Sequence, residues 1–156
     1  MANKPLTQAN GLVGNLLRRC HQSSVALFMQ NCAEQELTQL QYVILAALEE
    51  VGSCDQLTLG RLTALDRNTV AVVVKKLEQR GLLSRCRRSD DRRFMQVSLT
   101  EAGRMLRRVA EAQVLQTQSD ILAALNTTER QQLMAILQKM ADANNAYSRV
   151  PLGTAL

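Results

Sequence analysis

The fold of this chain is decided by Thr58–Thr100, which has the sequence TLGRLTALDRNTVAVVVKKLEQRGLLSRCRRSDDRRFMQVSLT. Its first half predicts two helices joined by a tight turn, with Thr58 capping the first helix and Asp66 the second. The second helix has one apolar stripe at helical spacing, made of Val70, Val73, Val74 and Leu77. Gly81 supplies the left-handed residue that ends this helix. Such a pair is a helix-turn-helix, whose second helix enters the major groove of DNA.

The second half of the stretch predicts a β-hairpin. Residues 82–88 form its first strand, residues 89–93 a charged tip and residues 94–99 the returning strand. The returning strand alternates apolar and polar residues, as a half-buried strand does, and its apolar side consists of Met95, Val97 and Leu99. A hairpin in this position is a wing, so the stretch predicts a winged helix.

Three segments, in this order, resemble the MarR family of winged-helix regulators. They are LDRNTV at residues 65–70, LEQRGL at residues 77–82, and DRR at residues 91–93 followed by VSLTEAG at residues 97–103. A weaker resemblance covers roughly residues 10 to 145. The resemblance implies a homodimeric regulator, most often a repressor, bound to a pseudo-palindromic operator with half-sites about one helical turn apart.

The expected fold class is mainly α with a small β-wing, in which a winged helix-turn-helix lobe carries long terminal helices that form a dimerisation region. We expect an amino-terminal arm and first dimerisation helix at residues 1–35 and the DNA-binding lobe at residues 36–100. The carboxyl-terminal dimerisation helices then occupy residues 101–147. Residues 148–156 form a tail without a recognisable pattern.

One further helix of the lobe is expected at residues 39–51. Thr38 and Gln41 can form a capping box at its start, and Gly52 ends it. Its buried face is expected to consist of Leu40, Val43, Ile44, Ala47 and Leu48.

Long helices flank the lobe on both sides. After a loose arm that contains Pro5, a helix is expected at residues 10–31, with apolar residues on more than one face. Thr100 caps a helix at residues 101–125, and a second helix follows at residues 127–146. Stripes of this length cannot be buried against so small a lobe, so these helices are expected to pair with a second copy of the chain.

Basic charge is concentrated in the predicted winged helix. Residues 57–108 hold 13 of the 19 Lys and Arg but only 5 of the 14 Asp and Glu, a net charge of +8, whereas the rest of the chain carries −3. A basic region that coincides with a helix-turn-helix indicates a surface for double-stranded DNA. The aromatic content of 3% disfavours the stacking platforms of proteins that bind single strands.

The sequence has no apolar run of 18 residues and no visible amino-terminal signal, so a cytoplasmic protein without a membrane partner is expected. Its four cysteines lack Cys-x-x-Cys spacing, so they are expected to be free thiols. With one histidine, they form no recognisable zinc set. No glycine-rich phosphate loop, Ser/His/Asp order or HExxH motif occurs. We therefore expect neither an enzyme nor a resident metal or cofactor.

The first turn of the recognition helix is expected to lie nearest the base edges. Asn68 can pair with adenine through two hydrogen bonds, and Arg67 and Thr69 flank it. Many relatives have Arg where this chain has Val72, so contacts with thymine methyl groups are expected there. Phosphate contacts fix the register without reading the sequence. They are expected from Arg61, Lys75, Lys76, Arg85, Arg87, Arg88 and Arg92.

At the wing tip, the resemblance implies that Arg93 enters the minor groove while Asp91 pairs with it and fixes its geometry. A narrow A·T-rich minor groove concentrates negative potential and attracts an arginine. An internal salt bridge that stabilises the hairpin is the alternative role of this pair.

Family members commonly bind aromatic carboxylates between the dimer helices and the winged lobe. Arg18, Arg19 and His21 offer donors for a carboxylate, with Tyr42 as a fourth candidate. The segment LLRRCH at residues 16–21 also loosely resembles repressors of nicotinate breakdown. The preferred hypothesis is thus a small aromatic or pyridine carboxylate as effector, although a lone histidine on a helix is more often structural or solvent-facing.

Two other modes of regulation remain open. Cys20 lies beside Arg19 and His21, a setting that could favour a redox-sensitive thiolate. A buried and inert Cys20 is nevertheless the favoured interpretation. The second possibility is an architectural DNA-binding protein without an effector, which would bind DNA with little sequence preference.

Overall fold

A computed structural model of the chain describes residues 5–87 and 95–153. Its larger helices are α2 (Val13–Asn31), α3 (Gln39–Val51), α4 (Gln56–Thr63), α5 (Arg67–Gln79), α6 (Glu101–Ile121) and α7 (Thr127–Ala143). Shorter elements are α1 (Pro5–Asn10), the strands β1 (Ser53–Cys54), β2 (Leu83–Arg87) and β3 (Met95–Leu99), and the 3₁₀ helix η1 (Asn145–Tyr147). The mainly α fold with a small β-wing is confirmed.

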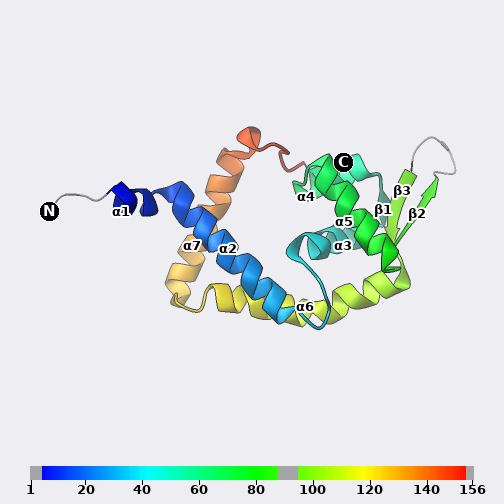
Figure 1. The fold of residues 1–156 in the computed structure, drawn as a ribbon, viewed down its shortest axis with the longest axis horizontal. Coiled ribbons are helices and arrows are strands. Elements are labelled where there is room, and N and C mark those ends of the chain that lie inside the picture. The colour runs from blue at the N-terminus through cyan, green and yellow to red at the C-terminus, as the bar shows by residue number, and fades with distance from the viewer. Residues whose placement is uncertain (1–4, 88–94, 154–156) are drawn as a thin grey trace.

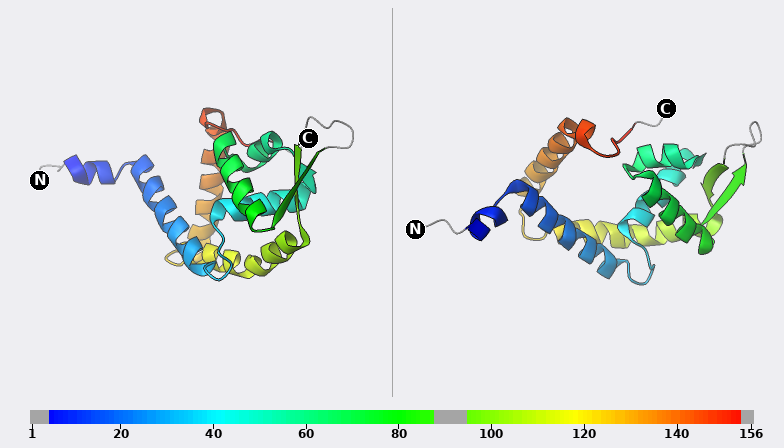
Figure 2. Two further views of the ribbon diagram at one scale, coloured as in Figure 1. Left: turned by 45° about the vertical axis from the view of Figure 1, so that its right-hand side comes forward. Right: turned by 45° about the horizontal axis from the view of Figure 1, so that its top comes forward.

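The winged lobe lies at one end of the molecule, and α6 leads away from it (Figure 1). Within the lobe, α4 and α5 form the helix-turn-helix, and α3 packs against both. The three strands form an antiparallel sheet in the order β1-β3-β2, with Leu83 opposite Leu99 and Arg87 opposite Met95. Beyond the lobe, α2 packs against α6, while α7 turns back so that the segment after it, which ends at Gly153, reaches α4 (Figures 1 and 2).

The core of the lobe is apolar and fully enclosed. The predicted stripe of α5 is confirmed, because all four of its members are buried. They pack with buried residues of α3, α4 and the sheet, including Ile44, Leu45, Leu48, Leu59 and Val97. This packing holds α5 at the surface with its polar face outward.

Side-chain caps fix the starts of most helices. The box of Thr38 and Gln41 forms as predicted, and Asp66 and Thr100 cap α5 and α6. A second capping box joins Asn126 to the third residue of α7. Gly81, the second residue after α5, has a φ of 71°, as expected for a glycine that ends a helix.

Thr58 does not cap the first helix of the helix-turn-helix. The cap is Asp55, whose Oδ1 accepts a 2.8 Å hydrogen bond from the backbone N–H of Thr58. The cap of α4 therefore lies three residues earlier in the chain than predicted. Thr58 instead donates from its hydroxyl to the second oxygen of Asp55, at 3.2 Å.

The amino-terminal arm is not a loop from Pro5 onward, because residues 5–10 form α1. Proline fits a first helical turn, where its missing N–H would have no partner. The long helix predicted from Asn10 is interrupted, and α2 begins at Val13 after a turn. The helices α6 and α7 end at Ile121 and Ala143, earlier than the predicted residues 125 and 146.

The predicted burial of two segments was partly wrong. On α3, Leu40 and Val43 are exposed, whereas Leu45 is completely buried. The helix contacts α4, α5 and α6, so its buried face is wider than a single stripe and is turned toward Leu45. On β3, Val97 and Leu99 are buried but Met95 at the strand start is exposed.

The flanking helices leave apolar side chains uncovered in the single chain. Those with high exposure include Leu12 and Val13 near the start of α2, Met105, Val109 and Leu115 on α6, and Met134 and Ile136 on α7. No residue of α7 is buried. In the described part of the chain, no helix combines the length and hydrophobicity needed to cross a membrane.

Candidate DNA interface and an adjoining cavity

The recognition helix α5 presents its first turn to solvent. Arg67 and Asn68 are exposed, and Thr69 is half-buried. Asp66 fixes this turn, because its Oδ1 accepts hydrogen bonds from the N–H groups of Asn68 and Thr69 at 3.0 and 3.1 Å. Val72, one turn further, is 54% exposed on the same helix. The residues predicted to contact base edges thus share the surface side of α5.

The turn between α4 and α5 is tight and depends on one glycine. Ala64 adopts a left-handed φ of 52°, and the N–H of Leu65 donates to the carbonyl of Gly60 at 3.0 Å. A Cβ atom at Gly60 would lie 2.8 Å from the carbonyl oxygen of Leu65, closer than side-chain carbons normally approach. The angle between the two helices therefore requires glycine at this position.

Arg80, which is not among the predicted site residues, anchors the last turn of the recognition helix. Its guanidinium donates to the backbone carbonyls of Glu36 and Gln35 at 2.7 and 3.0 Å. These carbonyls belong to the connection between α2 and α3. The contact joins residues more than forty positions apart, so no local sequence pattern could have predicted it.

The predicted phosphate contacts fall into three groups. Exposed cations on α4, α5 and β2 are Arg61, Lys75, Lys76 and Arg87. Arg85 forms a 2.7 Å ion pair with Glu78 of α5, which ties the wing to the recognition helix. The third group, Arg88 and Arg92, lies outside the described residues, and so does the predicted wing-tip pair of Asp91 and Arg93.

A cavity of about 560 Å³ opens beside the recognition helix, between α2, α3 and α5. His21 and Val25 line it from α2, and Leu40 lines it from α3. The wall formed by α5 includes Asn68, Thr69, Val72 and Lys76. The cavity thus combines apolar walls with an imidazole and an ammonium group. This combination suits a small anion that also has an apolar ring.

Of the four residues considered for ligand binding, only His21 is among those that line this cavity. Arg18 donates hydrogen bonds to Asn15 and Gln22 on the exposed surface of α2. Arg19 lines a different, smaller cavity of about 290 Å³. The ring of Tyr42 packs against that of Phe28, with 6.3 Å between the ring centroids.

The expectation that Cys20 is buried was wrong, since its side chain is exposed on α2 and lines the smaller cavity beside Arg19. All four cysteines are free thiols. Burial raises the pKa of Cys32, and burial together with the charge of Asp55 raises the pKa of Cys54 to about 11. Among the residues that the structure describes, no three His, Cys, Asp or Glu side chains gather in a group able to hold a metal ion.

The sequence of this chain matches a known protein family and a known repressor. Residues 37–95 match the family model described as MarR family. The chain is 34% identical over 132 residues to the HTH-type transcriptional repressor NicR of Pseudomonas putida, covering 85% of this chain and 84% of that repressor.

Two solved structures have the same fold. The first is BpsR of Bordetella bronchiseptica, from a study of how 6-hydroxynicotinic acid regulates the DNA binding of that protein. It is 36% identical to this chain, with a TM-score of 0.80, and the match covers 85% of this chain and 95% of BpsR. The second is the transcriptional regulator PcaV of Streptomyces coelicolor with its natural ligand, 32% identical, with a TM-score of 0.77 over 92% of this chain and 99% of that one. This chain therefore belongs to the MarR family of DNA-binding transcriptional regulators and is not an enzyme.

Proposed function

We propose that this chain acts as a homodimeric repressor that binds a pseudo-palindromic operator and is released by a small aromatic or pyridine carboxylate. The observation that carries the proposal is the cavity between α2, α3 and α5, because the recognition helix forms one of its walls. Asn68 and Val72 are both part of that wall and candidates for contacts with bases. A ligand in the cavity would therefore touch the helix that reads DNA.

The chemistry of the cavity supports a carboxylate with a flat ring. Lys76 can donate a charge-assisted hydrogen bond to the carboxylate, and His21 can donate a second one from α2. Val25 and Leu40 offer apolar surface for the ring. The volume lies within the range of cavities that bind small molecules. The regulation of BpsR by 6-hydroxynicotinic acid supports the same ligand class.

Lys76 can couple ligand binding directly to DNA binding. Its exposed ammonium is a candidate phosphate contact, yet the same side chain lines the cavity. A bound carboxylate would compete with a DNA phosphate for the ammonium group of Lys76. It would also favour positions of the two winged lobes in which the recognition helices do not fit the major grooves of the operator. A ten- to a hundredfold loss of DNA affinity requires the ligand to prefer the misfit state by about 1.4–2.7 kcal/mol.

The exposed apolar residues of α2, α6 and α7 support a homodimer. A second copy that covers these faces would remove a large apolar area from water, the main driving force of association. We assign dimerisation to residues 1–35 and 101–147 and DNA binding to residues 36–100. The two recognition helices would then contact successive major grooves about one helical turn apart.

Fluorescence anisotropy tests this proposal, with the reduced protein on its own upstream DNA at fixed salt and a panel of aromatic and pyridine carboxylates. We expect one compound to release the DNA from the wild-type protein and from Gln30→Ala, a control at an exposed residue of α2 outside the cavity. His21→Ala should need at least tenfold more of that compound.

Three results would change this account. Release by a peroxide and not by any carboxylate, reversed by thiol and lost in a Cys20→Ser variant, would replace the proposed effector with redox control at the exposed Cys20. Equal affinity for upstream and unrelated DNA would exclude the specific operator. A monomer in light scattering would exclude the dimer.

A further inference from the structure

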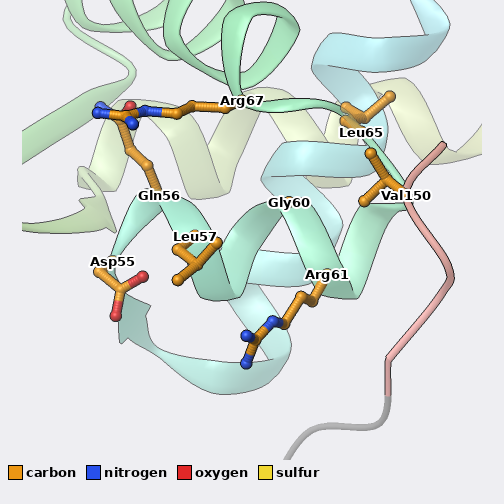
Figure 3. Close-up of a pocket in the computed structure, with 8 residues that line it drawn as sticks. All are labelled: Asp55, Gln56, Leu57, Gly60, Arg61, Leu65, Arg67 and Val150. Atoms are coloured by element: carbon orange, nitrogen blue, oxygen red, sulfur yellow. The ribbon is translucent and has the colours of Figure 1, made fainter.

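The carboxyl-terminal tail, residues 148–153, folds back onto the helix-turn-helix. The N–H of Gly153 donates a 2.9 Å hydrogen bond to the carbonyl of Arg61 in α4. A Cβ atom on Gly153 would lie 3.3 Å from the Cβ of Arg61, so the two backbones are in close contact. Figure 3 shows the tail passing the carboxyl-terminal end of α4, with Val150 next to Leu65.

Polar contacts of its own fix the shape of the tail. The amide side chain of Asn145 accepts a 2.8 Å hydrogen bond from the N–H of Leu152 and donates one of 3.1 Å to its carbonyl. The hydroxyl of Ser148 donates to the carbonyl of Val150 at 3.0 Å. Because Asn145 lies two residues after the end of α7, these bonds connect that end of the helix to a tail segment that contacts α4.

One residue of the tail, Val150, lines a cavity of about 500 Å³ whose other lining residues belong to the helix-turn-helix and its flanks. Val150 closes one end of this cavity beside Leu65, and Arg67 and Gln56 lie at the other end (Figure 3). Arg61 also lines the cavity. The tail thus lies among residues of α4 and α5 that are candidates for DNA contact.

Arg149 places an additional cation in this region. The side chain of Arg149 is exposed. Its neighbour in the chain, Val150, lines the same cavity as Arg67. Hydrogen bonds from Thr69 have the largest effect in lowering the pKa of Asp66, and the nearby charge of Arg149 adds to it. Arg149 therefore lies near the amino-terminal end of the recognition helix, the end that approaches DNA in a helix-turn-helix.

We propose that the tail is part of the DNA-binding surface, and that its anchor on α4 holds Arg149 as a phosphate contact beside the first turn of the recognition helix. The inference rests on the proposed DNA binding of the lobe. Each phosphate neutralised by a protein cation contributes about 0.9 to the slope of log K against log salt. Two copies of Arg149 in a dimer would contribute about 1.8 to that slope.

Salt titrations by anisotropy test the role of Arg149, on the upstream DNA and on an unrelated duplex. We expect Arg149→Ala to lower the slope by about 1.8 on both duplexes and Arg149→Lys to retain it. Lys139→Ala removes the same charge from an exposed position on α7 and should leave the slope unchanged. Equal slopes for Arg149→Ala and Lys139→Ala would overturn the assignment.

A second variant tests the anchor of the tail. Asn145→Ala removes both bonds to Leu152, so it should weaken DNA binding as much as Arg149→Ala, and the double variant should bind no more weakly than either. Wild-type binding by Asn145→Ala would overturn the anchoring role. If the wild-type protein prefers no sequence, the operator proposal fails, but the slopes on the unrelated duplex still decide the role of Arg149.

Discussion

The hydroxyl of Thr69 donates a 2.7 Å hydrogen bond to Oδ2 of Asp66, while Oδ1 of the same carboxylate accepts from the N–H groups of Asn68 and Thr69. One carboxylate therefore both caps the recognition helix and orients a side chain that lies at the candidate DNA interface. The hydrogen bond from the Thr69 hydroxyl is the largest of several effects that lower the pKa of Asp66 below its ordinary value of 3.8.

The lowered pKa predicts a dependence of stability on acid. A carboxyl group with a lower pKa in the folded state stabilises the fold above its ordinary pKa, and the contribution is lost as the pH falls through the folded value. In Asp66→Asn, the amide still caps the helix but does not titrate. The unfolding temperature of the wild-type protein should therefore exceed that of Asp66→Asn at pH 7, and the difference should shrink below about pH 4.

Thermal unfolding followed by circular dichroism, from pH 7 to pH 2.5 at one protein concentration, measures this difference. Glu50→Gln, at an exposed position of α3, is the control for loss of one carboxylate. A difference between wild type and Asp66→Asn that stays constant across this range would show that the charge of Asp66 contributes nothing.

Gly103, at the junction of the wing and α6, should not tolerate a side chain. A Cβ atom there would overlap the carbonyl oxygen of Leu82 and lie 3.2 Å from Cδ2 of Leu99. Since the backbone itself would have to move, Gly103→Ala should lower the free energy of unfolding by about 1–3 kcal/mol. Chemical denaturation at a fixed protein concentration measures the loss.

The matched control for this substitution is Gly14→Ala. Gly14 also lies in a helix, but no atom outside its local helix is within 4 Å of a Cβ built there. Alanine favours helix by roughly 0.5–1 kcal/mol over glycine, so this variant should be as stable as the wild type or slightly more so. Equal loss in both variants would disprove the role assigned to the contact with Leu82.

The ion pair between Glu49 of α3 and Arg107 should couple the winged lobe to α6. Its side chains are only 25% and 18% exposed, and Arg107 also lies 3.7 Å from Glu111. Because the pair is partly screened, we expect a coupling energy of roughly 1 kcal/mol in a double-mutant cycle with Glu49→Gln and Arg107→Gln. The coupling should decrease in 1 M salt.

The surface pair of Glu101 and Arg104 provides the comparison. These residues lie on one turn of α6, with a 3.0 Å contact, and their side chains are 70% and 40% exposed. Such a pair is expected to contribute about 0.3 kcal/mol. If the coupling energy between Glu49 and Arg107 is no larger than that of the surface pair, the contact does not fix the lobe on α6.

Signals that act within four residues could be predicted from the sequence. Thr38 with Gln41, Asp66 and Thr100 each cap a helix with their own neighbours, so they needed no knowledge of the fold. The cap of α4 was the exception, because Thr58 was predicted and Asp55 is observed. Both residue types cap helices, and the observed cap is recognised by the hydrogen bond from the Thr58 N–H to Asp55.

Contacts between distant segments could not be predicted in this way. Lys76 was expected to contact phosphate, and its place in the cavity depends on how α2 and α3 pack against α5. Leu40 was expected in the core for its spacing, yet it lines the same cavity. The tail has no periodicity at all, and its position follows from single bonds such as that from Gly153 to Arg61.

The four cysteines should separate into two classes in the folded protein. Cys20 and Cys86 are exposed, whereas Cys32 and Cys54 lie in the core. With its pKa near 11 instead of 9.0, Cys54 has roughly a hundredfold less thiolate at pH 8, in addition to being inaccessible. A chromogenic disulfide reagent should therefore react rapidly with two thiols per chain and with the other two only after unfolding. Cys86→Ser and Cys20→Ser should each remove one rapid equivalent, and rapid reaction of a third thiol in the wild-type protein would contradict the burial of Cys32 and Cys54.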